Sequence, residues 1–191
     1  MIATERDATA AAASVTGAAS GASDVQRDIT QAWAALATVP DPEIPMISVV
    51  ELGIVRDVRF AGDVLVVDLT PTYSGCPATD VITEDCAAAL AVAGFATTRI
   101  AMQLTPAWTT DWIAPEGRRK LAAFGIAPPG SPAPRIDVTG ISPLRRAAGV
   151  VPCPRCNSPR TRLIAQFGST ACKAQYRCDA CLEPFDYFKP H

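Results

Sequence analysis

The chain has 191 residues, which suits one domain of ordinary size plus a small second module. Its formal net charge of −2 offers no general attraction for nucleic acid or for anionic lipid, and both partners are therefore disfavoured. No apolar run approaches the ~20 residues of a membrane-spanning helix, so no membrane association is expected.

Residues 1–23 are rich in alanine, serine and threonine. They lack the aliphatic core and the basic start of a secretory signal, and their low hydrophobicity predicts a disordered arm. We therefore expect a cytoplasmic protein. In that compartment seven cysteines indicate metal or thiol chemistry rather than disulfides.

Six elements are predicted for residues 24–125. A capping box from Ser23 to Gln26 predicts the start of the first helix. The others, in chain order, are strands at 54–60 and 64–70, a helix at 77–93, a strand at 98–104 and a helix at 115–124 that ends at Gly125. In the last strand Ile100, Met102 and Leu104 are expected to face inward. This α-β-β-α-β-α order, with mostly antiparallel pairing, predicts a compact α+β domain.

A Pro-rich linker is predicted over residues 126–150, with four prolines in the seven residues 128–134. The second module, residues 151–191, contains two C-x2-C pairs separated by 21 residues. Such pairs form two knuckles that complete a tetrahedral S4 site, which predicts a small zinc ribbon. A redox pair and an iron–sulfur cluster on the same ligands are the alternatives. The four ligands are Cys153, Cys156, Cys178 and Cys181.

Cys172 is left over from this ligand set. It can be a small buried residue of the ribbon, as free cysteines often are. Alternatively, it is a thiol beside the zinc site that takes part in transient metal or cluster binding.

Cys76 and Cys86 have different predicted surroundings. Cys86 falls on the apolar face of the 77–93 helix, so it should be buried and inert. Cys76 precedes Pro77, a favoured residue in the first turn, which places it at or beside the N-cap. The helix dipole would lower the pKa of a thiol there and make it reactive, although Cys76 can also be a mere cap. Cys76 is the best candidate for chemistry in the main domain.

The sequence contains a single histidine, His191. Ser-His and Cys-His nucleophile pairs need an imidazole in a packed site, and di-iron carboxylate bundles need Glu-x-x-His motifs. The chain also has no P-loop and no G-x-G-x-x-G motif. These absences argue against a self-contained hydrolase, oxygenase or dehydrogenase.

Several stretches resemble known families. "DPEIP" (41–45), "ELGIV" (51–55) and "TPTYSGCPATD" (70–80) resemble the MIP18 family, also called the DUF59 family, which implies this α+β fold and a link to iron–sulfur cluster assembly. The reactive cysteine of that family maps onto Cys76. With "PAWTTDWI" (106–113) and "FGSTACKAQYRC" (167–178), residues 24–191 are similar to the D subunits of phenylacetyl-CoA ring epoxidase complexes.

The resemblance implies an accessory role in aerobic phenylacetate degradation. The implied partners are the other epoxidase subunits and iron–sulfur assembly proteins, and the implied cargo is iron or an iron–sulfur cluster. The chain would assist maturation of the iron–sulfur or di-iron centres and would not carry out oxygenation. A ribbon that binds nucleic acid or protein, and a thiol enzyme that uses Cys76, remain as alternatives.

Overall fold

The computed structural model describes residues 18–130 and 150–190. The predicted arm before residue 18 and linker residues 131–149 lie outside the described residues. The elements are α1 (Ala18–Leu36), β1 (Val55–Ala61), β2 (Val64–Leu69), α2 (Thr79–Val92), β3 (Thr98–Met102), the 3-10 helix η1 (Thr110–Trp112), α3 (Pro115–Phe124), β4 (Ile126–Ala127), β5 (Thr161–Ala165), β6 (Lys173–Cys178) and β7 (Pro184–Phe188). In the described ranges, no helix is both long and apolar enough to span a bilayer.

The main domain contains a three-stranded sheet in the order β1-β2-β3. β1 and β2 form the predicted antiparallel hairpin, whereas β3 pairs parallel to β2. The parallel pair follows from α2, which returns the chain to the end of the sheet where β2 began, so that β3 runs in the same direction. The predicted α+β class is confirmed, and half of the strand pairing in this sheet is parallel.

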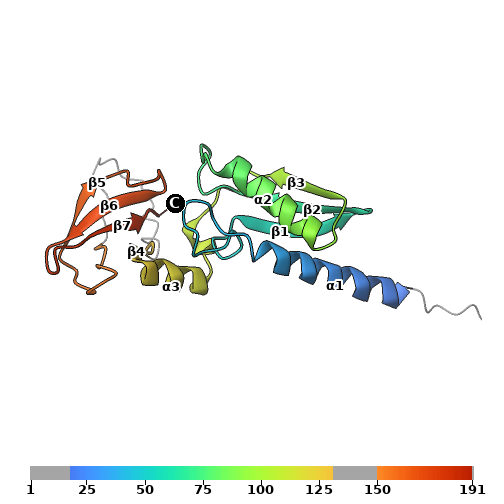
Figure 1. Cartoon of the computed structure of the whole chain (residues 1–191), viewed down its shortest axis with the longest axis horizontal. Helices are drawn as coiled ribbons and strands as arrows, with labels where there is room; N and C mark the ends of the chain where they lie inside the picture. The colour runs from blue at the N-terminus through green and yellow to red at the C-terminus, as the bar shows by residue number, and fades with distance from the viewer. Residues whose placement is uncertain (1–17, 131–149, 191) are drawn as a thin grey trace, which may run out of the picture.

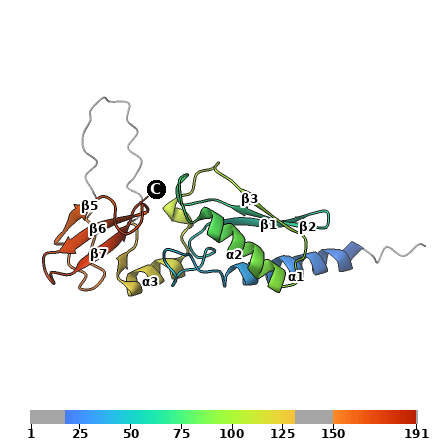
Figure 2. The same ribbon diagram turned by 45° about the horizontal axis from the view of Figure 1, so that its top comes forward.

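Helices α1 and α2 pack on one face of this sheet (Figures 1 and 2). The core between them is formed by alternating strand residues and one apolar stripe of each helix. Its fully or nearly fully buried members include Ala32, Leu36, Val58, Leu65, Val67, Ile82, Cys86 and Leu90.

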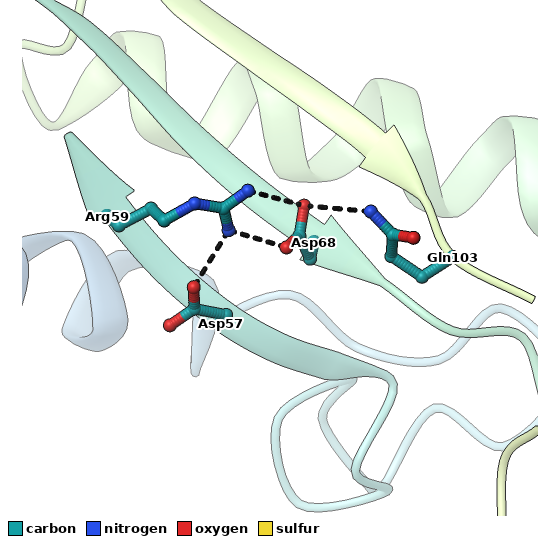
Figure 3. Close-up of polar contacts among 4 residues, drawn as sticks. All are labelled: Asp57, Arg59, Asp68 and Gln103. Atoms are coloured by element: carbon teal, nitrogen blue, oxygen red, sulfur yellow. Dashed lines mark hydrogen bonds and ion pairs between the residues drawn. The ribbon is translucent and has the colours of Figure 1, made fainter. Parts of the chain in front are cut away.

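A network of polar side chains lies on the opposite face of the sheet (Figure 3). Arg59 forms ion pairs with Asp57 and Asp68, and Gln103 donates a hydrogen bond to Asp68. Arg59 and Asp57 are about half exposed, so solvent screens these ion pairs and they contribute little to the stability of the fold. This network fixes the orientation of polar side chains on the sheet surface, while the core provides most of the stability.

Two local predictions are wrong. Helix α1 begins at Ala18, so the predicted capping box at Ser23 lies inside the helix, because the alanine-rich segment before it also favours a helical backbone. Met102 and Leu104 are 39% and 59% exposed, and only Ile100 of the predicted inward set is partly buried against the core. β3 is an edge strand and ends at Met102, which explains the weak burial there.

The ribbon forms a second sheet in the order β4-β7-β6-β5. The helix α3 ends as predicted, at Gly125 with φ of 90°, and the chain then enters β4 directly. β4 pairs parallel to β7, so the first two residues expected in the linker belong to the ribbon sheet. The ribbon therefore lies beside the α3 end of the main domain (Figures 1 and 2).

The two modules share part of one hydrophobic core. Phe188, at the end of β7, is fully buried, and its ring lies 5.9 Å from that of Trp108 in the main domain. The Trp108 indole N–H donates a hydrogen bond to the Leu52 carbonyl, which fixes the ring against the domain. Phe188 and Cys172 both belong to the core cluster of the main domain. The ribbon is thus packed onto the domain by apolar side chains.

Candidate functional site

The four predicted ribbon ligands converge in the structure. Cys153 and Cys156 precede β5, Cys178 is the last residue of β6, and Cys181 lies in the turn before β7. Their sulfur atoms all lie within 4.8 Å of one another. The Sγ–Sγ distances are 3.8 Å for Cys153–Cys181 and 3.6 Å for Cys156–Cys178. Tetrahedral Zn–S bonds of about 2.3 Å place sulfurs about 3.8 Å apart, so the four thiols fit one tetrahedral metal ion.

The backbone around these cysteines supports metal binding through N–H···S hydrogen bonds and tight turns. The N–H groups of Cys181 and Ala180 donate to Cys178 Sγ at 3.5 and 3.3 Å. These hydrogen bonds, the one from Cys181 first, lower the pKa of Cys178 to about 6 and favour the thiolate that a metal requires. The residue after each C-x2-C pair has a positive φ, 57° at Asn157 and 66° at Leu182, which turns the chain back beneath the site.

A second candidate site lies where the two modules meet. A cavity of about 20 Å³ is lined by Cys76 from the main domain and by Cys172 and Phe188 from the ribbon. Such a volume is enough for about one water-sized species. Most of its walls are aliphatic, and its polar lining includes the carboxylates Asp41 and Glu43. The structure therefore brings together two thiols that are far apart in the sequence, with two carboxylates beside them.

Cys76 is partly buried but does not cap a helix. The N-cap of α2 is Ala78 and the helix begins at Thr79, so the thiol lies before the first turn and not at its end. Burial raises the pKa of Cys76, and the charges of Glu43 and Asp41 raise it further, while the Ala78 N–H opposes them. The predicted lowering of this pKa by the helix dipole is therefore wrong.

Cys172 is 4% exposed and immediately precedes β6. Its sulfur lies 3.0 Å from the Thr170 hydroxyl and 3.7 Å from Glu43 Oε2. Burial raises the pKa of Cys172 to about 11, with a hydrogen bond from Thr170 acting in the opposite direction and Glu43 adding to the increase. Cys172 faces the main domain and lies in the same pocket as Cys76.

Cys86 provides a contrast to both thiols. It is fully buried in α2, as predicted, and burial raises its pKa to about 12. It does not line the pocket that contains Cys76 and Cys172. A thiol in this environment is a packing residue.

The carboxylates of the "DPEIP" stretch shape the pocket. Asp41 is 6% exposed and accepts hydrogen bonds from the N–H groups of Glu43 and Ile44 at 2.9 and 2.8 Å, which closes a tight turn. Burial raises the pKa of Asp41, and the charge of Glu43 raises it as well. Glu43 is partly buried, and its carboxylate faces Cys172.

Acidic residues in a proline-rich stretch such as "DPEIP" ordinarily close a turn or cap a helix. Asp41 has that ordinary role and also lines the pocket. Phe188 was missed as a pocket residue. A large apolar side chain in a strand predicts a core position, but nothing local indicates that this core belongs to the other module.

Comparison with known proteins finds two family regions in the chain. Residues 29–107 match the family model of an iron–sulfur cluster assembly protein, and residues 140–189 match that of the PaaD zinc beta ribbon domain. A Porphyromonas gingivalis protein (strain ATCC BAA-308 / W83), named as an Fe-S protein maturation auxiliary factor, is 36% identical over 88 residues, which are 45% of this chain and 83% of the relative.

Among solved structures, a DUF59 domain of unknown function from Bacillus anthracis is 25% identical with a TM-score of 0.49, and the match covers 52% of this chain and 96% of that one. The chain is also 47% identical over 161 residues to an Escherichia coli (strain K12) protein, named as the candidate D subunit of 1,2-phenylacetyl-CoA epoxidase. That match covers 84% of this chain and 92% of the relative. The chain therefore belongs to the family of phenylacetyl-CoA epoxidase D subunits.

Proposed function

We propose that this protein is an accessory subunit that helps to mature an iron–sulfur or di-iron centre of a phenylacetyl-CoA epoxidase. The observation that carries the proposal is the pocket between the modules, where thiols from both line one small cavity beside two carboxylates. Thiolate and carboxylate are ligands that iron accepts in proteins. The family model matched by residues 29–107 and the name of the E. coli relative support the same role.

Cys76 is the thiol that we propose for iron or cluster handling in the main domain. It is partly exposed, unlike Cys86 and Cys172, so a cargo or a partner can reach it from solvent. Because burial and the nearby carboxylates raise its pKa, the free thiol is mostly protonated near neutral pH. Such a thiol becomes a strong ligand only when a metal displaces its proton, which suits transient rather than permanent binding.

The ribbon is proposed to hold a structural zinc ion through its four cysteines. All four sulfurs lie within 4.8 Å of one another, which fits one central ion, whereas the ligands of a cluster are divided among two or more irons and cannot all lie so close together. Zinc would hold the two knuckles together, and a module of this size depends on such a link because its own core is small. The zinc-bound ribbon then presents Cys172 and Phe188 to the main domain.

We further propose that the partners are the other epoxidase subunits and proteins of iron–sulfur assembly, and that the protein acts in the cytoplasm. The family membership established above supports the first partner class. The iron–sulfur assembly family model supports the second.

The proposal is tested by replacing Cys76 with serine in an epoxidase reconstituted from all its subunits. We expect Cys76→Ser to keep the wild-type fold and zinc content but to lower epoxidase activity at least about tenfold, because the cargo loses a ligand. Cys86→Ala is the matched control, since Cys86 lies in α2 outside the pocket, and activity should stay within about twofold of wild type. Full activity with Cys76→Ser would overturn the proposed role.

A further inference from the structure

The two modules each provide one donor atom to the pocket between them. Cys172 Sγ, from the ribbon, lies 3.7 Å from Glu43 Oε2, from the main domain. Metal bonds of about 2.3 Å to sulfur and about 2.1 Å to oxygen, at a tetrahedral angle, place the two donors about 3.6 Å apart. The observed spacing thus fits one metal ion held between Cys172 and Glu43.

The size of the cavity limits the guest. Its volume of about 20 Å³ corresponds to roughly one water-sized sphere, so a single ion has a suitable size for it. An iron–sulfur cluster contains several metal and sulfide atoms and would require the modules to separate. The size of the pocket favours a mononuclear ion.

Cys76 is the third donor available in the same cavity. In the described part of the chain, only the four ribbon cysteines form a set of three or more His, Cys, Asp or Glu side chains whose ligand atoms all lie within 4.8 Å of one another. Cys76 must therefore move closer to complete the second site. Its side chain is only partly buried, so a change of rotamer toward the ion is sterically open to it.

The electrostatic environment favours a cation. Burial raises the pKa values of Asp41, Tyr73, Cys76 and Cys172, and the negative charge of Glu43 raises all four further. The buried cation Lys173 lowers the pKa values of Asp41 and Cys172 and also pairs with Asp186 at 3.8 Å. A divalent ion would add positive charge beside these acidic groups.

We propose that Cys172 and Glu43, joined by Cys76, form a second metal site that holds one divalent first-row transition-metal ion across the two modules. The inference deepens the proposed function, in which that ion is ferrous iron carried as cargo. As the ion binds, the two thiols release their protons to solvent and form two metal–sulfur bonds. Glu43 adds one metal–oxygen bond, and no electron is transferred.

The test uses the full-length protein with its ribbon filled by one equivalent of zinc. Cobalt(II) is then titrated anaerobically, because sulfur-to-cobalt charge-transfer absorption reports directly on thiolate ligation. We expect a second, sulfur-ligated equivalent in the wild type. Cys172→Ser and Glu43→Gln should each weaken its apparent affinity at least about tenfold, and Cys172→Ser should also reduce the charge-transfer intensity.

Matched controls separate the site from general effects. Cys86→Ala removes a thiol outside the pocket, and Glu84→Gln removes an exposed carboxylate of α2. Both should bind the second equivalent like the wild type. Glu43 is not a core residue, so Glu43→Gln stays informative if Cys172→Ser proves unstable. Absence of a second equivalent in the wild type, or its full retention in Glu43→Gln, would overturn the inference.

The cobalt titration tests the metal site and the epoxidase assay tests the maturation role, and either hypothesis can fail without the other. If the second cobalt binds as expected but Cys76→Ser supports full epoxidase activity, the metal site stands and the maturation role fails. If no second cobalt binds but Cys76→Ser abolishes activity, the maturation role stands and the metal site is wrong.

Discussion

Replacement of Phe188 by alanine tests whether the ribbon is part of the main-domain core. Phe188 belongs to the ribbon strand β7, yet it is fully buried and packs against Trp108. Truncation of a buried phenylalanine typically costs about 3–5 kcal/mol. Because Phe188 lines the pocket, the new void joins an existing cavity, and we expect the lower end of this range, about 3 kcal/mol.

Urea denaturation followed by tryptophan fluorescence measures this effect on the correct module. All three tryptophans, Trp33, Trp108 and Trp112, lie in the main domain, so the signal reports unfolding of that domain, and Trp108 also responds to loss of its contact with the ribbon. With an m-value of about 2 kcal/mol/M, a loss of about 3 kcal/mol lowers the midpoint by about 1.5 M. The protein should be loaded with zinc so that the ribbon itself stays folded.

The control is Phe167→Ala. Phe167 is a ribbon phenylalanine that is 68% exposed, and the Lys189 ammonium lies over its ring. Its loss should cost at most about 1 kcal/mol. If Phe188→Ala leaves the midpoint where the wild type has it, the ribbon does not contribute to the stability of the main domain, and the shared core is refuted.

Two further predictions concern a glycine and the thiols. Gly53→Ala should lower the free energy of unfolding by at least about 2 kcal/mol, because φ is +74° and the new Cβ would lie 2.6 Å from the Trp112 carbonyl oxygen. The control Gly62→Ala has φ of +63° and no atom within 4 Å of the new Cβ, so it should lower that free energy by only about 1 kcal/mol. Equal losses in thermal or urea unfolding would contradict the clash at Gly53. Alkylation of Cys76, followed by peptide mass mapping in the zinc-loaded protein, should still accelerate as the pH rises past about 8.5, the ordinary thiol pKa, because the pKa of Cys76 is raised, while Cys86 reacts more slowly. A rate that levels off near pH 7 would instead show a lowered pKa.

Much of the fold was predictable because its signals are local. Pro115 and Gly125 bracket α3 in the sequence and in the structure. The turn residues between 60 and 64 define the β1–β2 hairpin, and the spacing of the four ribbon cysteines alone predicts their convergence. Each of these signals depends on backbone preferences or ligand chemistry over a short stretch of chain.

The pocket between the modules was not predictable as a unit. Cys76 and Cys172 line one cavity because Phe188 and Trp108 pack the ribbon onto the domain, and no local pattern encodes the approach of such distant segments. The pKa of Cys76 was predicted in the wrong direction for a related reason. Pro77 suggested that a helix starts beside the thiol, whereas a turn precedes α2 and the charge of Glu43 comes from another part of the chain.

The short strand β4 has a practical consequence for anyone who wishes to produce the modules separately. A fragment that starts at residue 150 would leave out Ile126 and Ala127, and β7 would then expose a row of unpaired backbone groups along one side. Such a fragment is prone to self-association through that side. A chain cut after α3 would in turn lose the phenylalanine that covers Trp108. Excision of either module therefore exposes a surface that favours aggregation, and the undivided polypeptide is the suitable unit for biochemical work.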